Sequence, residues 1–226
     1  MITSRDNERL KLVRKLHERR WRDKLGLFFV EGEDAVAAAA GVAPVDLLRA
    51  GEDVEPPLLA EVATAPHPPR VIGVYRRADL PAWEERDATL ALWQLADPGN
   101  VGTLIRTADA FAAAVVLADG CADPTSPKAL RASAGSIWRV PLGTWEASNR
   151  LLQGTTRVAL VAHGGRDLAH VDLSGRVTLL LGAEREGLPD TVSRDVDATI
   201  PIGSAESLNV AATGAIALYE LARRRL

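Results

Sequence analysis

The sequence predicts an α/β protein in which a small α/β unit precedes a larger unit built on a mainly parallel sheet. From residue 88 onward, runs of branched apolar residues alternate with helical patterns, which is typical of parallel strands covered by helices. The first 75 residues hold shorter elements, and the polar segment 76–88 lacks a clear periodicity. We therefore expect a first domain at residues 1–75, a linker at 76–88 and a second domain at 89–226.

The composition is that of a globular chain. Of its 226 residues, 47% are apolar and 25% are charged, which argues against a disordered or fibrous protein. The longest apolar run, residues 110–118, is far shorter than the roughly 20 residues that span a membrane. The charged N-terminus lacks the apolar centre of a secretory signal, and a single cysteine, Cys121, excludes an internal disulfide. We expect a cytoplasmic protein with no membrane partner.

Charge is unevenly distributed along the chain. Residues 1–26 hold nine Lys and Arg against four Asp and Glu, a net charge of +5 within a chain of net charge −3. The remainder therefore carries −8. A basic element on an acidic body is typical of nucleic-acid binding, although the solvated face of an ordinary helix produces the same pattern. The candidate nucleic-acid contacts are Arg9, Lys11, Arg14, Lys15, Arg19 and Arg22.

The elements of the first unit follow from the spacing of apolar residues. An amphipathic helix is predicted over residues 7–24, because Leu10, Val13 and Leu16 recur at helical spacing. The remaining elements are strands at 27–30, 45–48 and 70–75 and a helix at 34–40. Trp21 lies on the basic helix, where such a residue either packs or stacks on a base.

The second unit alternates between strands and helices. The predicted strands are residues 89–95, 115–117, 157–162, 177–181 and 198–202. The predicted helices are residues 101–113, residues 127–135 and a last helix that ends at Arg225. Ligands of such sheets bind beyond the carboxyl ends of the strands, so we expect the functional residues in the loops that follow them.

Three of those regions carry distinctive motifs. The first, D-P-G-N-V-G-T-L-I-R-T-A at 97–108, lacks the G-x-G-x-x-G spacing of dinucleotide binding. The second, L-L-L-G-A-E-R-E-G-L at 179–188, ends an apolar strand at a glycine, where backbone can approach a ligand. The third, I-P-I-G-S-A-E-S-L-N-V at 200–210, opens the last helix, whose first N–H groups are unpaired. Taken singly, each motif is also explained by a turn or a helix cap.

Taken together and in this order, the motifs resemble the three signature motifs of the SpoU (TrmH) branch of the SPOUT RNA methyltransferases. The match extends over residues 95–220. In addition, N-x-x-x-K at Asn7 and Lys11, with L-F-F-V-E-G at 27–32, resembles a small ribosomal-protein-like RNA-binding domain that many members carry. The resemblance implies a SPOUT-type sheet with a C-terminal trefoil knot, S-adenosylmethionine as cofactor, and a homodimer whose active site lies at the subunit interface.

The resemblance also implies the site residues. The catalytic or substrate-side positions are Asn100, Arg106, Glu184, Ser207 and Asn209. The cofactor-binding positions are Gly182, Ile200, Ile202 and Leu208. Because a guanidinium seldom loses its proton, we expect Arg106 to hold phosphate and to stabilise the charge that develops on the attacking oxygen. Glu184 either orients Asn100 or Arg106, or accepts a proton itself.

The expected function is S-adenosylmethionine-dependent 2'-O-methylation of a ribose in RNA. The accessory domain favours ribosomal RNA; the alternatives are a transfer RNA ribose methyltransferase and a non-catalytic RNA-binding or assembly protein. Residues 124–137, with Lys128 and Arg131, form either a further RNA contact or an ordinary surface helix. The four histidines lack metal-ligand spacing, so we expect no metal.

Overall fold

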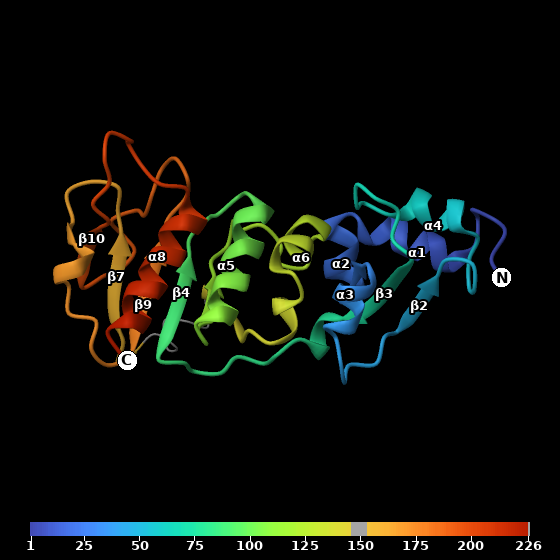
Figure 1. Ribbon diagram of the computed structural model, residues 1–226, viewed down its shortest axis with the longest axis horizontal. Helices are drawn as coiled ribbons and strands as arrows, with labels where there is room; N and C mark the ends of the chain where they lie inside the picture. The colour runs from blue at the N-terminus through green and yellow to red at the C-terminus, as the bar shows by residue number, and fades with distance from the viewer. Residues whose placement is uncertain (146–152, 226) are drawn as a thin grey trace.

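The computed structural model describes residues 1–145 and 153–225. Within them, the chain forms an elongated molecule with one β-sheet toward each end (Figure 1). The small sheet has three antiparallel strands in the order β1-β3-β2, and the large sheet has seven parallel strands in the order β6-β5-β4-β9-β7-β10-β8. The parallel sheet confirms the α/β class predicted from the alternation of strands and helices.

The small sheet and its helices form the N-terminal unit. Its strands are β1 (Leu27–Glu31), β2 (Asp46–Arg49) and β3 (Val71–Arg76). Its helices are α1 (Glu8–Leu16), α2 (Arg19–Leu25), α3 (Glu33–Ala37) and α4 (Pro56–Val62). Leu10, Val13 and Leu16 of α1 are fully buried against this sheet, as their spacing predicts.

The single helix predicted over residues 7–24 is wrong, because the chain breaks at His17 and Glu18. The side chain of Arg22, on the second helix, stabilises this break. The Nη1 atom of Arg22 donates to the carbonyl oxygens of Leu16 and His17, both at 2.8 Å, and so satisfies the last carbonyls of α1. Apolar periodicity carries no signal for such a break.

The large sheet forms the C-terminal unit. Its strands are β4 (Ala88–Leu92), β5 (Ala114–Leu117), β6 (Leu142–Thr144), β7 (Thr156–Leu160), β8 (Arg166–Asp167), β9 (Val177–Leu181) and β10 (Val196–Thr199). Its helices are α5 (Pro98–Ala110), α6 (Pro127–Ser133) and α8 (Val210–Arg223), with short 3-10 helices η1 (Arg77–Asp79), η2 (Ser136–Trp138) and η3 (Leu168–His170). No helix of the described residues is long and apolar enough to cross a membrane.

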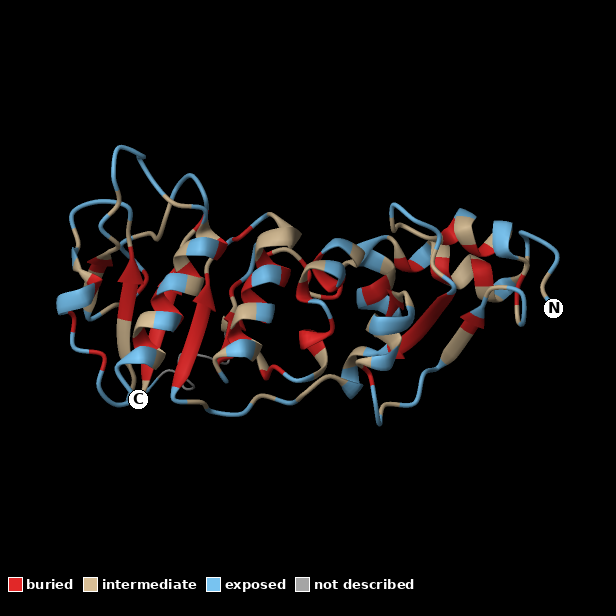
Figure 2. Ribbon diagram, viewed as in Figure 1, coloured by how far each residue is buried: buried red, intermediate tan, exposed pale blue. Residues whose placement is uncertain are grey.

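The central strands of the large sheet are buried on both faces. Every residue of β4 and β9 is buried, and α5 and α8 lie across one face of these strands (Figure 2). Because the strands are parallel, their carboxyl ends meet at one edge, the upper edge in Figure 1. We call this edge, with the loops that leave it, the carboxyl edge.

A largely buried set of polar side chains, the junction cluster, ties the two units together. It comprises Arg22 of α2, Arg77 of η1, and Asp123 and Thr125 from the loop after β5. Both arginines donate to Oδ2 of Asp123, at 2.7 and 2.6 Å, while Thr125 donates to Oδ1 through its backbone N–H and its hydroxyl. Burial alone would raise the pKa of Asp123, but the bonds from Thr125 and the charges of Arg77 and Arg22 lower it instead.

The junction cluster corrects one prediction. Arg22 is 3% exposed, and Asp123 and two carbonyls occupy its guanidinium, so it cannot present that group to a nucleic acid. Its charge stabilises the junction instead.

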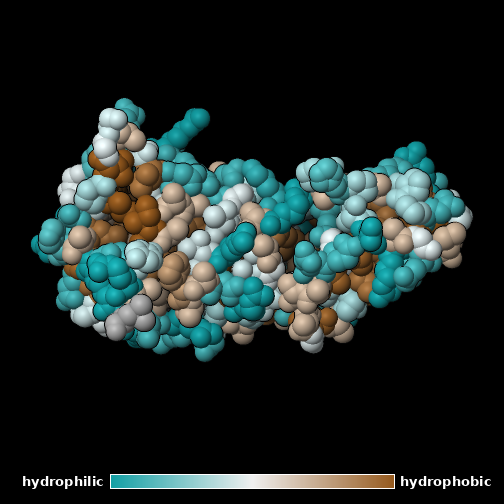
Figure 3. Space-filling model, in the orientation of Figure 1, coloured by the Kyte–Doolittle hydropathy of each residue, from teal (hydrophilic) through white to brown (hydrophobic). Residues whose placement is uncertain are grey.

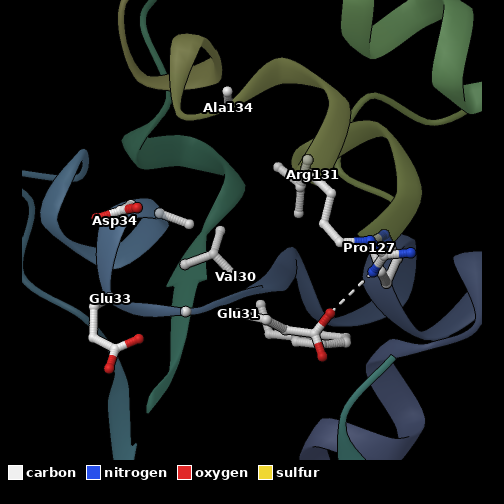
Figure 4. A pocket seen from close by; sticks show the side chains of 11 residues that line it. Val30, Glu31, Glu33, Asp34, Pro127, Arg131 and Ala134 are labelled. Carbon is white, nitrogen blue, oxygen red and sulfur yellow. Dashed lines mark hydrogen bonds and ion pairs between the residues drawn. The ribbon is translucent and has the colours of Figure 1, made fainter. Parts of the chain in front are cut away.

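Helix α6 forms a second seam between the units. A pocket of about 310 Å³ lies at this seam. In it, Glu31 at the end of β1 faces Arg131 of α6 (Figure 4), and Nη1 of Arg131 donates to Oε2 of Glu31 at 3.1 Å. Arg131 also donates to the hydroxyl of Thr64, and Trp138 of η2 packs against Tyr75 at 4.8 Å between ring centroids. Residues 124–137 therefore act as a connector, which neither expectation for this segment described.

Candidate functional site

A cavity of about 740 Å³ opens at the carboxyl edge. Its walls come from the ends of β7, β9 and β10, the loops that follow them, and the first turn of α8. Figure 3 shows hydrophobic surface gathered over the end of the molecule that carries β7 and β10, where several cavity residues are only half buried. The expected cofactor-binding residues Gly182, Ile200, Ile202 and Leu208 all line it, and so do Glu184, Ser207 and Asn209.

Asn100 is the hub of the site. It lies in the first turn of α5, and its Nδ2 atom donates to Oε1 of Glu184 at 3.0 Å. Its Oδ1 atom accepts from Nδ2 of Asn209 at 3.1 Å. We call Asn100, Glu184 and Asn209 the site cluster; each comes from a different motif, and 109 residues separate Asn100 from Asn209. The structure thus brings together three of the five expected catalytic residues.

Helix caps hold two of these side chains in place. Asn209 is the N-cap of α8, where its Oδ1 accepts from the N–H groups of Ala211 and Ala212 and leaves Nδ2 for Asn100. Asp97 is the N-cap of α5 and accepts from the N–H of Asn100 at 3.0 Å. Both caps fix the backbone at the point where a side chain of the site cluster leaves it.

Asp97 is itself held from α6. Lys128 Nζ lies 2.6 Å from the Asp97 carboxylate, and this hydrogen bond lowers the pKa of Asp97 below its ordinary value. Sequence reasoning missed Asp97 and Lys128 as supports of the site. The D-P pair at the start of the first motif, a capping residue followed by proline in the first turn, was the available signal for Asp97.

Gly182 allows the second motif to fold back on itself. Residues 183 and 187 pair as a tight antiparallel turn, and a Cβ at Gly182 would lie 2.2 Å from the carbonyl carbon of Gly187. Any other residue would push this turn away from the strand end. The glycine therefore places Glu184 over the cavity by allowing close backbone approach.

Arg106 stands apart from the site cluster. It lies six residues beyond Asn100 on α5, so helix geometry turns its side chain about 240° from that of Asn100. It is exposed and is not among the cavity-lining residues, and no group of the described residues pairs with its guanidinium. Ser207 does line the cavity and is exposed at its rim.

Further polar residues line the cavity that sequence reasoning did not assign to the site. They are His163, Arg185, Glu186 and Glu206, together with Thr213 of α8. The first four lie in loops at the carboxyl edge, where the topology of a parallel sheet predicts ligand contacts. No cluster of side chains suited to hold a metal ion occurs in residues 1–145 and 153–225.

The basic residues of the N-terminal unit differ in what they contact. Arg9 pairs with Asp46, and Lys11 pairs with Glu8. Arg14 donates to the carbonyl oxygen of Arg5 and lies 3.5 Å from Glu61. Arg19 and Lys15 are exposed, Arg19 with Asp23 at 3.6 Å and Lys15 over the ring of Trp21 at 5.4 Å.

Comparison with known proteins identifies the protein family. Residues 87–219, which include the large sheet and all three motifs, match the model of the SpoU rRNA Methylase family. The chain therefore belongs to the SpoU rRNA methylase family. This confirms the family expected from the motifs.

Individual relatives extend the likeness over the whole chain. The 23S rRNA (guanosine(2553)-2'-O)-methyltransferase RlmP of Bacillus subtilis is 32% identical, over 97% of this chain and 98% of that protein. The crystal structure of an AdoMet-bound rRNA methyltransferase from Sinorhizobium meliloti has a TM-score of 0.88 at 29% identity and covers 100% of this chain and 98% of that one. The SpoU methyltransferase AviRb of Streptomyces viridochromogenes, in complex with AdoMet, has a TM-score of 0.85 at 29% identity, over 97% and 98%.

Proposed function

We propose that the protein transfers a methyl group from S-adenosylmethionine to a ribose 2'-hydroxyl of ribosomal RNA. The observation that carries the proposal is the site cluster at the rim of the cavity. Exposed polar contacts of this kind contribute little to folding stability, so three motifs that converge on such contacts indicate a site rather than a structural brace.

The cavity suits S-adenosylmethionine in size and chemistry. Its volume of about 740 Å³ lies within the range of roughly 300–1,000 Å³ common for small-molecule sites. Ile200, Ile202 and Leu208 offer an apolar wall for the adenine ring, and the loop backbone offers N–H and C=O groups for the polar ends. When bound, S-adenosylmethionine supplies a methyl group on a positively charged sulfur.

The site cluster positions groups for the RNA side of the reaction. Because the amide of Asn100 donates to Glu184 and accepts from Asn209, its orientation is fixed before substrate arrives. Glu184 uses one carboxylate oxygen for this task, so we assign it the role of orienting Asn100 rather than that of a base. Ser207 lines the same cavity and offers a hydroxyl to the substrate or to the loop.

Arg106 supplies the cation that the reaction needs. The 2'-hydroxyl gives its proton to phosphate or water as its oxygen accepts the methyl group, and the donor sulfur leaves as a neutral sulfide. A nearby guanidinium stabilises the negative charge that develops on the oxygen and holds the adjacent phosphate. Its exposed guanidinium is available for this role. Arg106 lies outside the cavity lining of its own chain, which supports a site completed by a second chain.

We therefore propose a homodimer with the active site at the subunit interface. Helix α8, which packs beside α5, exposes Ile216 (39%) and Tyr219 (57%), and exposed large apolar side chains on one helix are typical of an interface. Light scattering of the purified protein should give twice the chain mass of 24.2 kDa. A monomer under assay conditions would contradict this part of the proposal.

Ribosomal RNA is favoured over transfer RNA as the substrate. The Bacillus relative named for 23S rRNA is similar over nearly the full length of both chains, including the N-terminal unit. The trefoil knot, the cytoplasmic location and the domain limits at 1–75, 76–88 and 89–226 stay predictions.

The test is to incubate the protein with tritium-labelled S-adenosylmethionine and separated pools of 23S rRNA, 16S rRNA and tRNA. Label in a ribosomal pool supports the proposal, and mapping then gives the nucleotide. Label in tRNA alone would reassign the substrate. Donor binding in calorimetry without transfer to any pool would favour the non-catalytic RNA-binding alternative.

A further inference from the structure

Three cations surround one aromatic ring on the N-terminal unit. Lys24 Nζ, Lys15 Nζ and the guanidinium carbon of Arg20 lie 5.1, 5.4 and 5.7 Å from the centre of the Trp21 ring. All three cationic side chains are exposed, and Trp21 is half-buried between them. We call Lys15, Arg20, Trp21 and Lys24 the Trp21 cluster.

The charge of the Trp21 cluster is poorly neutralised. Within residues 1–145 and 153–225, no carboxylate lies within ion-pair distance of Lys15 or Lys24, and Arg20 pairs only with the exposed Glu18. Other basic residues of α1 have carboxylate partners, namely Arg9, Lys11 and Arg14. Like charges held together without counter-charge attract an anion, because its arrival removes their mutual repulsion.

The cluster is fixed beside the edge that carries the candidate site. Helix α2 is anchored to the loop after β5 by Arg22, which bonds Asp123, and by Arg19, which donates to the carbonyl of Cys121 at 3.3 Å. β5 pairs in parallel with β4, and the loop after β4 leads to Asn100 in the first turn of α5, so both loops leave the same edge of the sheet. A polymer bound along this edge can reach both places.

We infer that the Trp21 cluster binds an unpaired nucleotide of the RNA substrate, with a base stacked on the indole and the flanking phosphates held by the three cations. The inference rests on the proposed function and adds a specific contact to it. Aromatic faces with flanking basic groups are the usual means of holding single-stranded RNA. An acidic peptide has the negative charge but no flat base for the ring, so the aromatic centre favours RNA.

The lysines can move aside for the base. Each ammonium group stands on a flexible four-carbon chain, so it can leave the ring face and follow a phosphate without backbone movement. The half-buried ring, in contrast, is held on a helix anchored by the junction cluster. The cluster thus combines a fixed stacking surface with mobile charges.

The experiment measures binding of a short, unstructured oligouridine RNA to the full-length protein by fluorescence anisotropy. Trp21→Ala should weaken binding by about tenfold, because stacking of one base on an aromatic side chain accounts for a factor of this order. Trp21→Phe should restore most of the loss, since the phenyl ring keeps a stacking face. Thermal unfolding and calorimetric binding of S-adenosylmethionine, measured on each variant, show whether the fold and the cavity are intact.

Salt dependence tests the cations. The double variant Lys15→Ala and Lys24→Ala should reduce the slope of log affinity against log salt by about 1.4, the value for two lost phosphate contacts on a single strand. Arg49→Ala is the matched control: it removes an exposed cation of the same N-terminal unit that already has Glu52 and Asp53 as partners, so it should leave the slope unchanged.

Several results would overturn the inference. Unchanged affinity of a folded Trp21→Ala variant would show that the ring is a packing residue. A salt slope reduced as much by Arg49→Ala as by the double lysine variant would show that binding is spread over the whole surface of the N-terminal unit. Poly-glutamate that binds with the same dependence on Trp21 would reassign the surface to an acidic protein. These outcomes are separate from the proposed function, which fails only if the unaltered protein transfers no methyl group to RNA.

Discussion

The junction cluster and the site cluster are both built from hydrogen-bonded polar side chains but lie in opposite environments. At the junction, the side chains of Arg22 and Asp123 are 4% and 6% exposed, and both oxygens of Asp123 accept hydrogen bonds. At the site, the bonds from Asn100 to Glu184 and from Asn209 to Asn100 are exposed, and bonding capacity remains for a ligand. A saturated buried cluster fixes shape, whereas an open cluster can still bind. In this chain, a charged side chain that is buried and fully hydrogen-bonded is therefore structural. One that is exposed and keeps free hydrogen-bonding capacity is available for function.

The largest loss of folding stability is expected from a substitution in the junction cluster. Asp123→Asn removes the negative charge that the buried Arg22 and the partly exposed Arg77 share, and removal of one partner from a buried ion pair costs about 3–5 kcal/mol of unfolding free energy. Urea titration followed by circular dichroism measures it.

The matched control is Asp190→Asn, which removes a fully exposed carboxylate that lies 3.3 Å from Arg194. Its effect should stay below about 1 kcal/mol. Equal stability losses in the two variants would mean that burial does not distinguish the two kinds of ion pair.

The next effect is expected at the site. Asn100→Ala removes the hub that joins Glu184 to Asn209, so methyl transfer to RNA should fall by about a hundredfold, as for loss of one preorganised polar group. Unfolding free energy should hardly change, because the lost bonds are exposed. A stability loss as large as that of Asp123→Asn, with transfer retained, would reverse the roles of the two clusters.

Acid should weaken the junction selectively. Because the folded protein lowers the pKa of Asp123, its contribution to stability is complete above the unfolded value of about 3.9 and is lost as pH falls below it. The difference in melting temperature between the unaltered protein and Asp123→Asn should therefore narrow below about pH 4. A difference that stays constant down to the lowest measurable pH would contradict the lowered pKa.

A smaller loss of stability is expected when a helix N-cap is removed, and the effect on methyl transfer should depend on whether that cap lies at the site. Asp97→Ala removes the N-cap of α5, and Ser126→Ala removes that of α6, so each should cost about 1 kcal/mol of unfolding free energy. Only Asp97→Ala should also lower methyl transfer, because Asp97 bonds the backbone of Asn100. Equal losses of transfer in both variants would show that the cap acts through stability alone.

The fold was predictable where one element carries its own signal. The apolar runs of β4 and β9 predict buried parallel strands, and both strands are buried throughout. Helix α4 was not predicted because Pro56 and Pro57 resemble a linker, although proline is common in the first turn of a helix. The break between α1 and α2 depends on where the Arg22 side chain lies, which apolar spacing does not encode.

The candidate site was predictable in its residues but not in its contacts. The order of three motifs indicates Asn100, Glu184 and Asn209, and the structure adds that their side chains bond one another. In the sequence, Arg22 and Lys15 are both basic residues of the same segment. In the structure, Arg22 pairs with Asp123, 101 residues away, whereas Lys15 has no carboxylate partner within the described residues. Long-range partners decide which charges remain available, and one sequence does not contain them.

The most direct test of the account is transfer of labelled methyl groups to 23S rRNA by the unaltered protein and by Arg106→Ala, followed by alkaline hydrolysis of the RNA. A methylated 2'-oxygen cannot take part in alkaline cleavage, so the account predicts label in an alkali-stable dinucleotide. In Arg106→Ala, the rate of methyl transfer should fall by about a hundredfold or more, while the affinity for S-adenosylmethionine should be unchanged. Label only in alkali-labile mononucleotides, or full transfer by Arg106→Ala, would contradict it.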